Sequence, residues 1–169
     1  MHRFWQETVW RQFGAALDML ENAIRACPEH VWGDRAGFHE FWYMVYHTLF
    51  WTDYYLSESG DGFRPPEPYT LSEFDPEGAF PDRAYSKDEM LEYLGYCRAK
   101  CRSAVSALTE ESSQQLNAHG RKELTVAELH LYTMRHVQHH SAQLNLLLRQ
   151  RIDSAPRWVG RTQKSLDQS

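Results

Sequence analysis

Apolar residues recur at three- and four-residue spacings over residues 4–26, a pattern typical of an amphipathic helix. The apolar positions include Val9, Phe13, Leu17, Leu20 and Ile24. Pro28 should end this helix, because the residue before a proline is pushed out of the helical region. The pattern therefore predicts a first long helix that stops near Ala26.

Residues 38–57 form a second stretch, which is rich in aromatic side chains. Aromatic residues favour strands, so a strand is the first alternative. However, a run of about twenty residues without Gly or Pro is longer than the usual strand of about 3–10 residues. We therefore predict a second helix here.

Two capping boxes predict the starts of two further helices. In a capping box a hydroxyl and a carboxylate each satisfy a backbone N–H at the helix start. Ser86 and Glu89 form the first box, and Thr125 and Glu128 form the second. We expect the third helix to continue to about Leu108 and the fourth to about Arg151. A short turn at residues 117–122 should join them.

Residues 60–85 are rich in Pro and Gly but also contain apolar anchors, which are Phe63, Tyr69, Leu71, Phe74 and Phe80. These anchors indicate an ordered crossover rather than a floppy linker. Long loops in compact domains are often functional, so this segment is a candidate lid. A segment that only carries the chain from one end of the bundle to the other is the alternative, and the sequence leaves both open.

Four long helices with a long connection between the second and third predict an all-α fold, a four-helix bundle with a crossover. The 169 residues suit one domain, which we place at residues 1–152. Pro156 should prevent further helix, so residues 153–169 are expected to be a solvated C-terminal tail, with the last dozen residues frayed.

Composition narrows the function classes. The net charge of −5 argues against nucleic acid as a partner, because phosphates require a clustered positive field. No segment approaches the ~18 apolar residues of a membrane span, and polar residues interrupt positions 1–13, where a signal peptide would be apolar. Three cysteines do not make a disulfide framework. We therefore expect a reduced, cytoplasmic protein without a membrane partner.

Three of the nine histidines are candidate metal ligands. His136 and His140 stand four apart, so their side chains lie on one face of the fourth helix, although a polar helix face also produces such pairs. His47 lies in an aromatic, core-like part of the second helix, where a buried imidazole needs either a metal or a hydrogen-bond partner. A core histidine bonded to a tyrosine or a carbonyl is the alternative.

The remaining histidines carry weaker expectations. His139 points about 100° away from its neighbour His140, which predicts a position behind the ligands or on the surface. The others are expected on helix surfaces, in loops or in solvent: His130 and His39 in the first two settings, and His2, His30 and His119 in the last.

Two segments resemble the DinB-like (DinB/YfiT) superfamily. Residues 45–56 (VYHTLFWTDYYL) are similar to its second-helix histidine segment, and residues 125–144, which include His136 and His140, are similar to its fourth helix. Helix order, crossover and length agree over about residues 1–150. One departure is Ser141-Ala142, where the family often has a small Gly after the last histidine pair.

The resemblance implies a four-helix bundle that binds a divalent metal through His47, His136 and His140. Zinc or nickel is the expected cofactor, with iron or manganese as alternatives. Many members form dimers, so a homodimer is expected. Members with known chemistry include thiol-dependent transferases and isomerases, of the mycothiol and bacillithiol type, and others are described as metal-dependent hydrolases. The implied substrate is a small molecule such as a low-molecular-weight thiol.

Three imidazoles leave a metal ion its full charge and an open position, which suits activation of a thiol or a water. The zincin pattern His-Glu-x-x-His is absent, since Val137 follows His136, so no glutamate base is built in. Helical spacing places four residues near the site: the catalytic candidates Tyr132 and Glu40, together with Trp51 and Gln143. Plain packing is the alternative for Tyr132.

Cys97 and Cys101 also stand four apart, so a rival zinc site made of these thiols and a histidine must be considered. Two buried, inert thiols are the alternative. Three function classes stay open: a metal-dependent enzyme (thiol S-transferase or hydrolase), a non-catalytic metal-binding stress or sensor protein, and a bundle with a purely structural metal. No residue pattern identifies the substrate.

Overall fold

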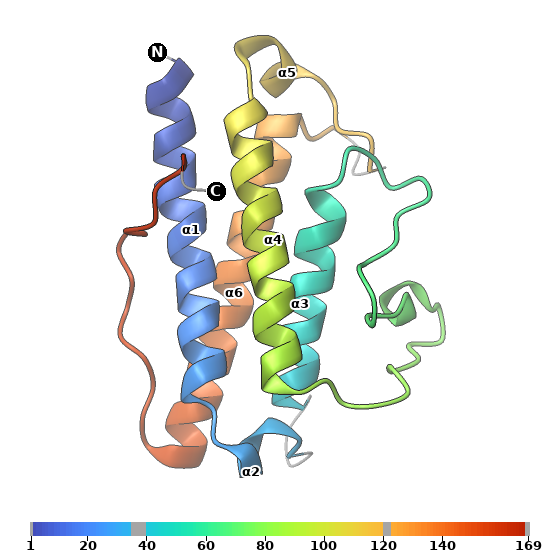
Figure 1. Cartoon of the computed structure of the whole chain (residues 1–169), viewed down its shortest axis with the longest axis vertical. Coiled ribbons are helices and arrows are strands. Elements are labelled where there is room, and N and C mark those ends of the chain that lie inside the picture. The colour runs from blue at the N-terminus through green and yellow to red at the C-terminus, as the bar shows by residue number, and fades with distance from the viewer. Residues whose placement is uncertain (1, 35–39, 120–122, 168–169) are drawn as a thin grey trace.

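The structure, a computed structural model, describes residues 2–34, 40–119 and 123–167. Within these ranges the regular structure is helical, apart from a single bridge between Leu116 and Thr125. Four long helices form a bundle (Figure 1): α1 (His2–Ala26), α3 (Phe41–Tyr55), α4 (Lys87–Ala107) and α6 (Val126–Ile152). Helices α1 and α3 each pack against both α4 and α6. The predicted all-α class is confirmed.

Three short helices lie in the connections and were not predicted: α2 (Glu29–Trp32), the 3-10 helix η1 (Ser72–Phe74) and α5 (Glu110–Gln114). Helix α5 has its own cap, because the hydroxyl of Thr109 accepts a hydrogen bond from the Ser112 backbone. Such short helices contain too few residues for a hydrophobic period to show in the sequence. Part of the predicted 117–122 turn lies outside the described residues.

The predicted helix boundaries follow the local chemistry. Helix α1 ends at Ala26, immediately before Cys27-Pro28. Both predicted capping boxes are present, so α4 begins after Ser86 and α6 begins after Thr125. Helix α3 begins at Phe41, and position 38, where we expected its start, lies outside the described residues.

The core explains why α3 is so aromatic. Two thirds of its positions are buried, around most of its circumference. The bundle covers one side, and the crossover of residues 60–85 covers the other: Phe74 lies 5.0–5.6 Å from the rings of Phe50, Trp51 and Tyr54. The hydroxyl of Tyr46 also donates to the Thr70 carbonyl at 2.7 Å. The predicted ordered crossover is therefore confirmed.

A buried ion pair fixes α3 against α4. Asp53 is fully buried, and its carboxylate accepts hydrogen bonds from the Lys100 ammonium and, at 3.0 Å, from the Tyr93 hydroxyl. Burial raises the pKa of Asp53, while Lys100 opposes that shift. Removing one partner of such a pair would leave an uncompensated charge in the interior, which is strongly destabilising.

The C-terminal tail is docked rather than frayed, although most of its side chains are exposed, as expected. Residues 153–167 run back along α1 (Figure 1), where the indole of Trp10 donates to the Lys164 carbonyl at 2.7 Å. The Thr162 amide donates to the Arg11 carbonyl at 3.0 Å, and Leu166 is only 7% exposed. This segment has few apolar residues, and they do not recur at helical spacing. Its docking on α1 could therefore not be predicted from the sequence.

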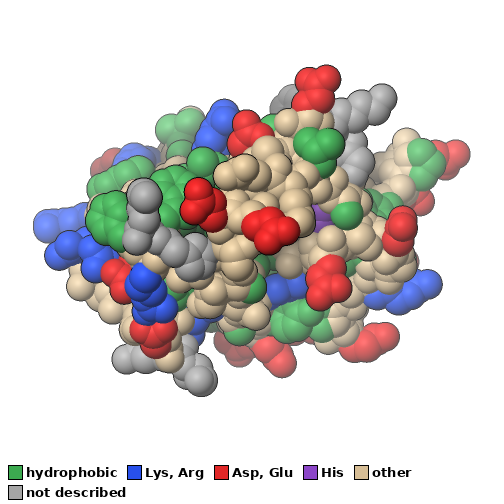
Figure 2. Space-filling view, turned by 90° about the horizontal axis from the view of Figure 1, so that it is seen from above, with side chains coloured by type: hydrophobic (Ala, Val, Ile, Leu, Met, Phe, Trp, Pro, Cys, Tyr) green, Lys and Arg blue, Asp and Glu red, His purple; other side chains and the backbone are tan. Residues whose placement is uncertain are grey.

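Figure 2 shows one end of the molecule, where acidic and basic side chains are interspersed and hydrophobic side chains gather on the side of α1. Phe4 and Trp5, in the first turns of α1, are exposed. Among the described residues, no helix combines the length and apolar character needed to cross a membrane.

Gly14 allows the tail to approach α1, because a Cβ at this position would lie 2.5 Å from Cγ2 of Thr162. We predict that Gly14→Ala lowers the free energy of unfolding, since such overpacking costs about 1–3 kcal/mol. Urea denaturation measures the change. Trypsin should also cleave the displaced tail faster at Arg157 and Arg161.

Gly95→Ala is the matched control, since Gly95 lies within α4 and a Cβ there would meet no atom within 4 Å. Helix propensity alone should stabilise this variant by about 0.5–1 kcal/mol. Equal stabilisation of both variants, with the tail still protected from trypsin, would contradict the docking of residues 153–167 on α1.

Candidate metal centre

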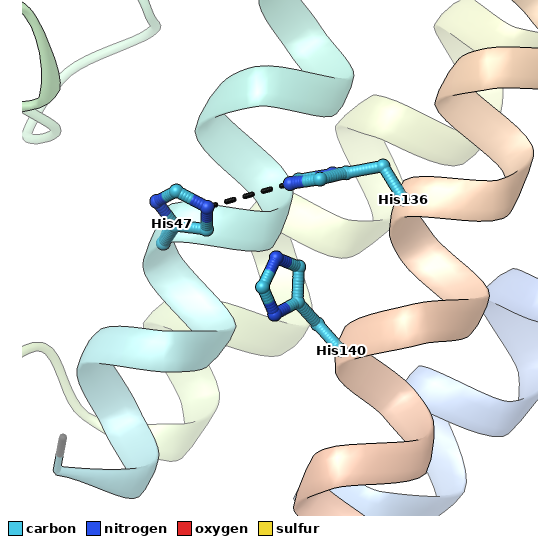
Figure 3. A group of neighbouring side chains, drawn as sticks. All are labelled: His47, His136 and His140. Carbon is cyan, nitrogen blue, oxygen red and sulfur yellow. Dashed lines mark hydrogen bonds between the residues drawn. The ribbon is translucent and has the colours of Figure 1, made fainter. Parts of the chain in front are cut away.

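Three histidine side chains meet between α3 and α6. Figure 3 shows His47 projecting from α3 toward α6, while His136 and His140 project toward it from successive turns of α6. One ring nitrogen of each lies within 4.8 Å of the others, and the ring centroids are 4.5–5.3 Å apart. Among the described residues this is the one group of three or more His, Cys, Asp or Glu side chains with that spacing.

One pair of ring nitrogens has the spacing that a small divalent ion needs. A tetrahedral ion with metal–nitrogen bonds of about 2.0–2.1 Å needs ligand nitrogens about 3.3–3.4 Å apart. Nε2 of His47 and Nε2 of His136 are separated by 3.4 Å. Imidazole nitrogens are ligands that zinc, nickel and iron all accept. The residues present therefore fit such an ion.

The far side of His47 is held by a carboxylate. Nδ1 of His47 lies 2.7 Å from Oε2 of Glu73, and the Trp51 indole donates to the same oxygen at 2.8 Å. Because a carboxylate only accepts hydrogen bonds, a neutral His47 carries its proton on Nδ1 and presents a bare Nε2 to α6. His47 is thus not the buried core residue that its sequence context suggested, since its side chain is 30% exposed.

His140 is arranged in the same way. Its Nδ1 lies 2.7 Å from the amide oxygen of Gln143, which likewise accepts and leaves Nε2 without a proton. Burial and the neighbouring His47 ring lower the pKa of His140 to about 4. At neutral pH the imidazole is therefore uncharged, which is the form that binds metals.

Glu73 was not predicted from the sequence, because it lies in the crossover and helical spacing says nothing about its place. Helix η1 places it beside α3, and its side chain is only 5% exposed. Burial on its own would raise the pKa of Glu73, but the hydrogen bonds from His47 and Trp51 hold it below its ordinary value. The available signal was a carboxylate flanked by the apolar anchors Leu71 and Phe74 in a segment expected to be ordered.

Of the four residues expected near the site by helical spacing, Trp51 and Gln143 contact it as described. Tyr132 packs edge-on against Tyr55, with ring centroids 5.5 Å apart. No observation tests the catalytic role predicted for Glu40 or Tyr132, which stays a prediction. Glu40 lies at the N-cap position of α3, where its carboxylate accepts a hydrogen bond from the Trp42 indole, and it is outside the histidine group.

The rival cysteine site gains no support. Cys97 and Cys101 are fully buried in α4, and within the described parts of the chain no third ligand joins them. The thiol of Cys97 lies 3.5 Å from the Leu49 carbonyl, and burial raises the pKa of both thiols. Both therefore behave as small apolar core residues.

The outcomes for the other histidines differ. His30 and His139 are exposed, as expected. His130, expected at a helix surface or in a loop, is instead only 7% exposed, with Nδ1 donating to the Val126 carbonyl at 2.7 Å. His119 was expected in solvent but is half-buried and hydrogen-bonded to the Ser57 carbonyl at 2.8 Å. His39 and the side chain of His2 lie outside the described residues.

Comparison with known proteins identifies the family. The sequence profile of the DinB superfamily matches residues 12–144, which contain all three histidines of the cluster. Comparisons with curated proteins and with solved structures gave no match. The match covers most of the chain and agrees with the all-helical fold and the three-histidine cluster, which is compatible with metal binding. The chain therefore belongs to the DinB superfamily.

Proposed function

We propose that this protein binds one divalent metal ion through His47, His136 and His140 and uses it in catalysis. The observation that carries the proposal is the convergence of three imidazoles, two of which have Nε2 bared by an acceptor at Nδ1. Zinc or nickel is the proposed ion, with iron or manganese as alternatives. Imidazole ligands suit zinc, nickel and iron.

When bound, an ion with three neutral ligands keeps its double charge and an open position, and so lowers the pKa of a thiol or water placed there. A purely structural site would have four protein ligands, whereas the described residues supply three. The protein's own part is to orient the ligands through Glu73 and Gln143 and to shield one side of the site with the crossover.

A low-molecular-weight thiol is the proposed substrate, in an S-transferase reaction. The histidine cluster itself contains no carboxylate, and the neighbouring Glu73 carboxylate is hydrogen-bonded to Nδ1 of His47 and to Trp51. A thiol needs less help than water to ionise, because its pKa is already much lower. Hydrolysis of a small ester or amide is the second reaction to test. The family resemblance also leads us to propose a homodimer.

The ligand set predicts the effect of a single substitution. His136→Ala should lose the metal ion or bind it at least tenfold more weakly, because it removes one of three ligands. His139→Ala is the matched control, since it removes an exposed histidine from the same helix and should keep the ion. Elemental analysis of the purified proteins gives the metal content.

A wild-type protein without a stoichiometric divalent ion after incubation with zinc would overturn the proposed site. Full metal content in His136→Ala, with a zinc dissociation constant equal to that of the wild type in chelator competition, would overturn it equally.

The buried thiols should be irrelevant to the metal. A Cys97→Ala, Cys101→Ala double variant is expected to bind the same amount of metal as the wild type, although the lost packing should lower its thermal stability. Metal content per folded protein, with folding checked by circular dichroism, is the measurement. A loss of one equivalent from the folded double variant would restore the cysteine site.

Catalysis itself is tested by rates. Metal-loaded wild-type protein should accelerate the alkylation of a small thiol by an electrophilic halide, in which the thiolate displaces halide and the thiol proton passes to buffer. His136→Ala should not accelerate it. Hydrolysis of a nitrophenyl ester is measured in parallel. If wild type and His136→Ala give equal rates in both reactions, the enzymatic proposal fails in favour of a sensor or structural role.

A further inference from the structure

We propose that Glu73 is a positioning residue that fixes His47 as an Nε2 ligand and thereby couples the crossover of residues 60–85 to the metal centre. The coupling between the crossover and the metal centre rests on the metal site proposed above. The orientation of His47 by Glu73 does not depend on a bound metal. Glu73 comes from neither α3 nor α6, so it adds a third element of the fold to the site.

The contact is built for one carboxylate oxygen. Oε2 of Glu73 accepts hydrogen bonds from His47 and from Trp51, which lie four residues apart on the same face of α3. Oε2 lies 2.7 Å from Nδ1 of His47 and 2.8 Å from Nε1 of Trp51. With its side chain 5% exposed, Glu73 has little water to compete for these bonds.

A charged acceptor at Nδ1 changes what Nε2 does. A carboxylate hydrogen-bonded to a ligating histidine fixes the tautomer and ring orientation and makes the metal-binding nitrogen more basic. A bound ion in turn makes the Nδ1 proton more acidic, which strengthens its hydrogen bond to Glu73. The metal and the carboxylate should therefore stabilise each other through the imidazole of His47.

The crossover takes part in this coupling. Phe74, next to Glu73, packs among Phe50, Phe63 and Tyr54. This packing holds the backbone that carries the Glu73 carboxylate in place. If this docking supports metal binding, then metal binding must support the docking to the same extent, because linkage is reciprocal. Residues 60–85 are then a closing element of the site rather than a bare connection.

A purely structural role is the competing explanation, in which Glu73 only anchors the crossover to Trp51. That role would change protein stability but would leave the tautomer of His47 and the zinc affinity of folded protein alone. Nitrogen NMR and metal titration separate the two explanations, because neither measures stability.

The first measurement uses metal-free protein, at one pH where His47 is neutral. Long-range proton–nitrogen NMR should show the Nδ1–H tautomer of His47 in the wild type and in Glu77→Gln, which alters an exposed carboxylate of the same segment. In Glu73→Ala the proton should move to Nε2 in a large part of the population. An unchanged tautomer in folded Glu73→Ala would overturn the positioning role.

The second measurement is zinc affinity by chelator competition. Glu73→Gln keeps an acceptor oxygen but loses the charge, so its zinc dissociation constant should rise about 10- to 100-fold, the usual effect of losing such a partner. Glu77→Gln should match the wild type. Zinc should also slow trypsin cleavage after Arg83, at the end of the crossover, in the wild type more than in Glu73→Gln.

The outcomes keep the two proposals apart. A wild type that binds no zinc refutes the proposed metal site, while the NMR result still decides the orientation of His47. Zinc binding that is equal in wild type and Glu73→Gln refutes the coupling and leaves the three-histidine site standing.

Discussion

The packing of α3 against α6 is the constraint on which the site depends. His47 and His136 are 89 positions apart in the chain, and their Nε2 atoms approach to 3.4 Å only because the two helices lie in one register. That register is held from both sides of α3. The bundle core and the Asp53–Lys100 pair fix one side, and the aromatic residues of the crossover cover the other. A small slip of α3 would separate the ligands.

Much of this was predictable from sequence, for local reasons. The capping boxes at Ser86 and Thr125 fix where two helices begin, and four-residue spacing alone puts His136 and His140 on one face. His47 was harder to place, because spacing gives no relation between two helices. The family resemblance supplied that relation, and the folded chain brings the three residues together, although their role as ligands stays a prediction.

The features that were not predicted depend on tertiary contacts between residues that follow no regular spacing in the sequence. Glu73 lies in an irregular segment, and only the docking of Phe74 brings it to His47. The tail of residues 153–167 is held by backbone hydrogen bonds and by a gap at Gly14, neither of which has a compositional signature. His130 was expected at a helix surface or in a loop, yet the fold buries it.

X-ray absorption at the metal edge tests the central claim most directly, because it reports the ligand atoms themselves. For zinc-loaded protein, three-histidine ligation predicts nitrogen neighbours at about 2.0–2.1 Å, with outer-shell scattering from three imidazoles and no sulfur neighbour. A sulfur shell at about 2.3 Å would indicate the cysteines instead. A spectrum with sulfur, or with scattering from no imidazole, would contradict a centre made of His47, His136 and His140.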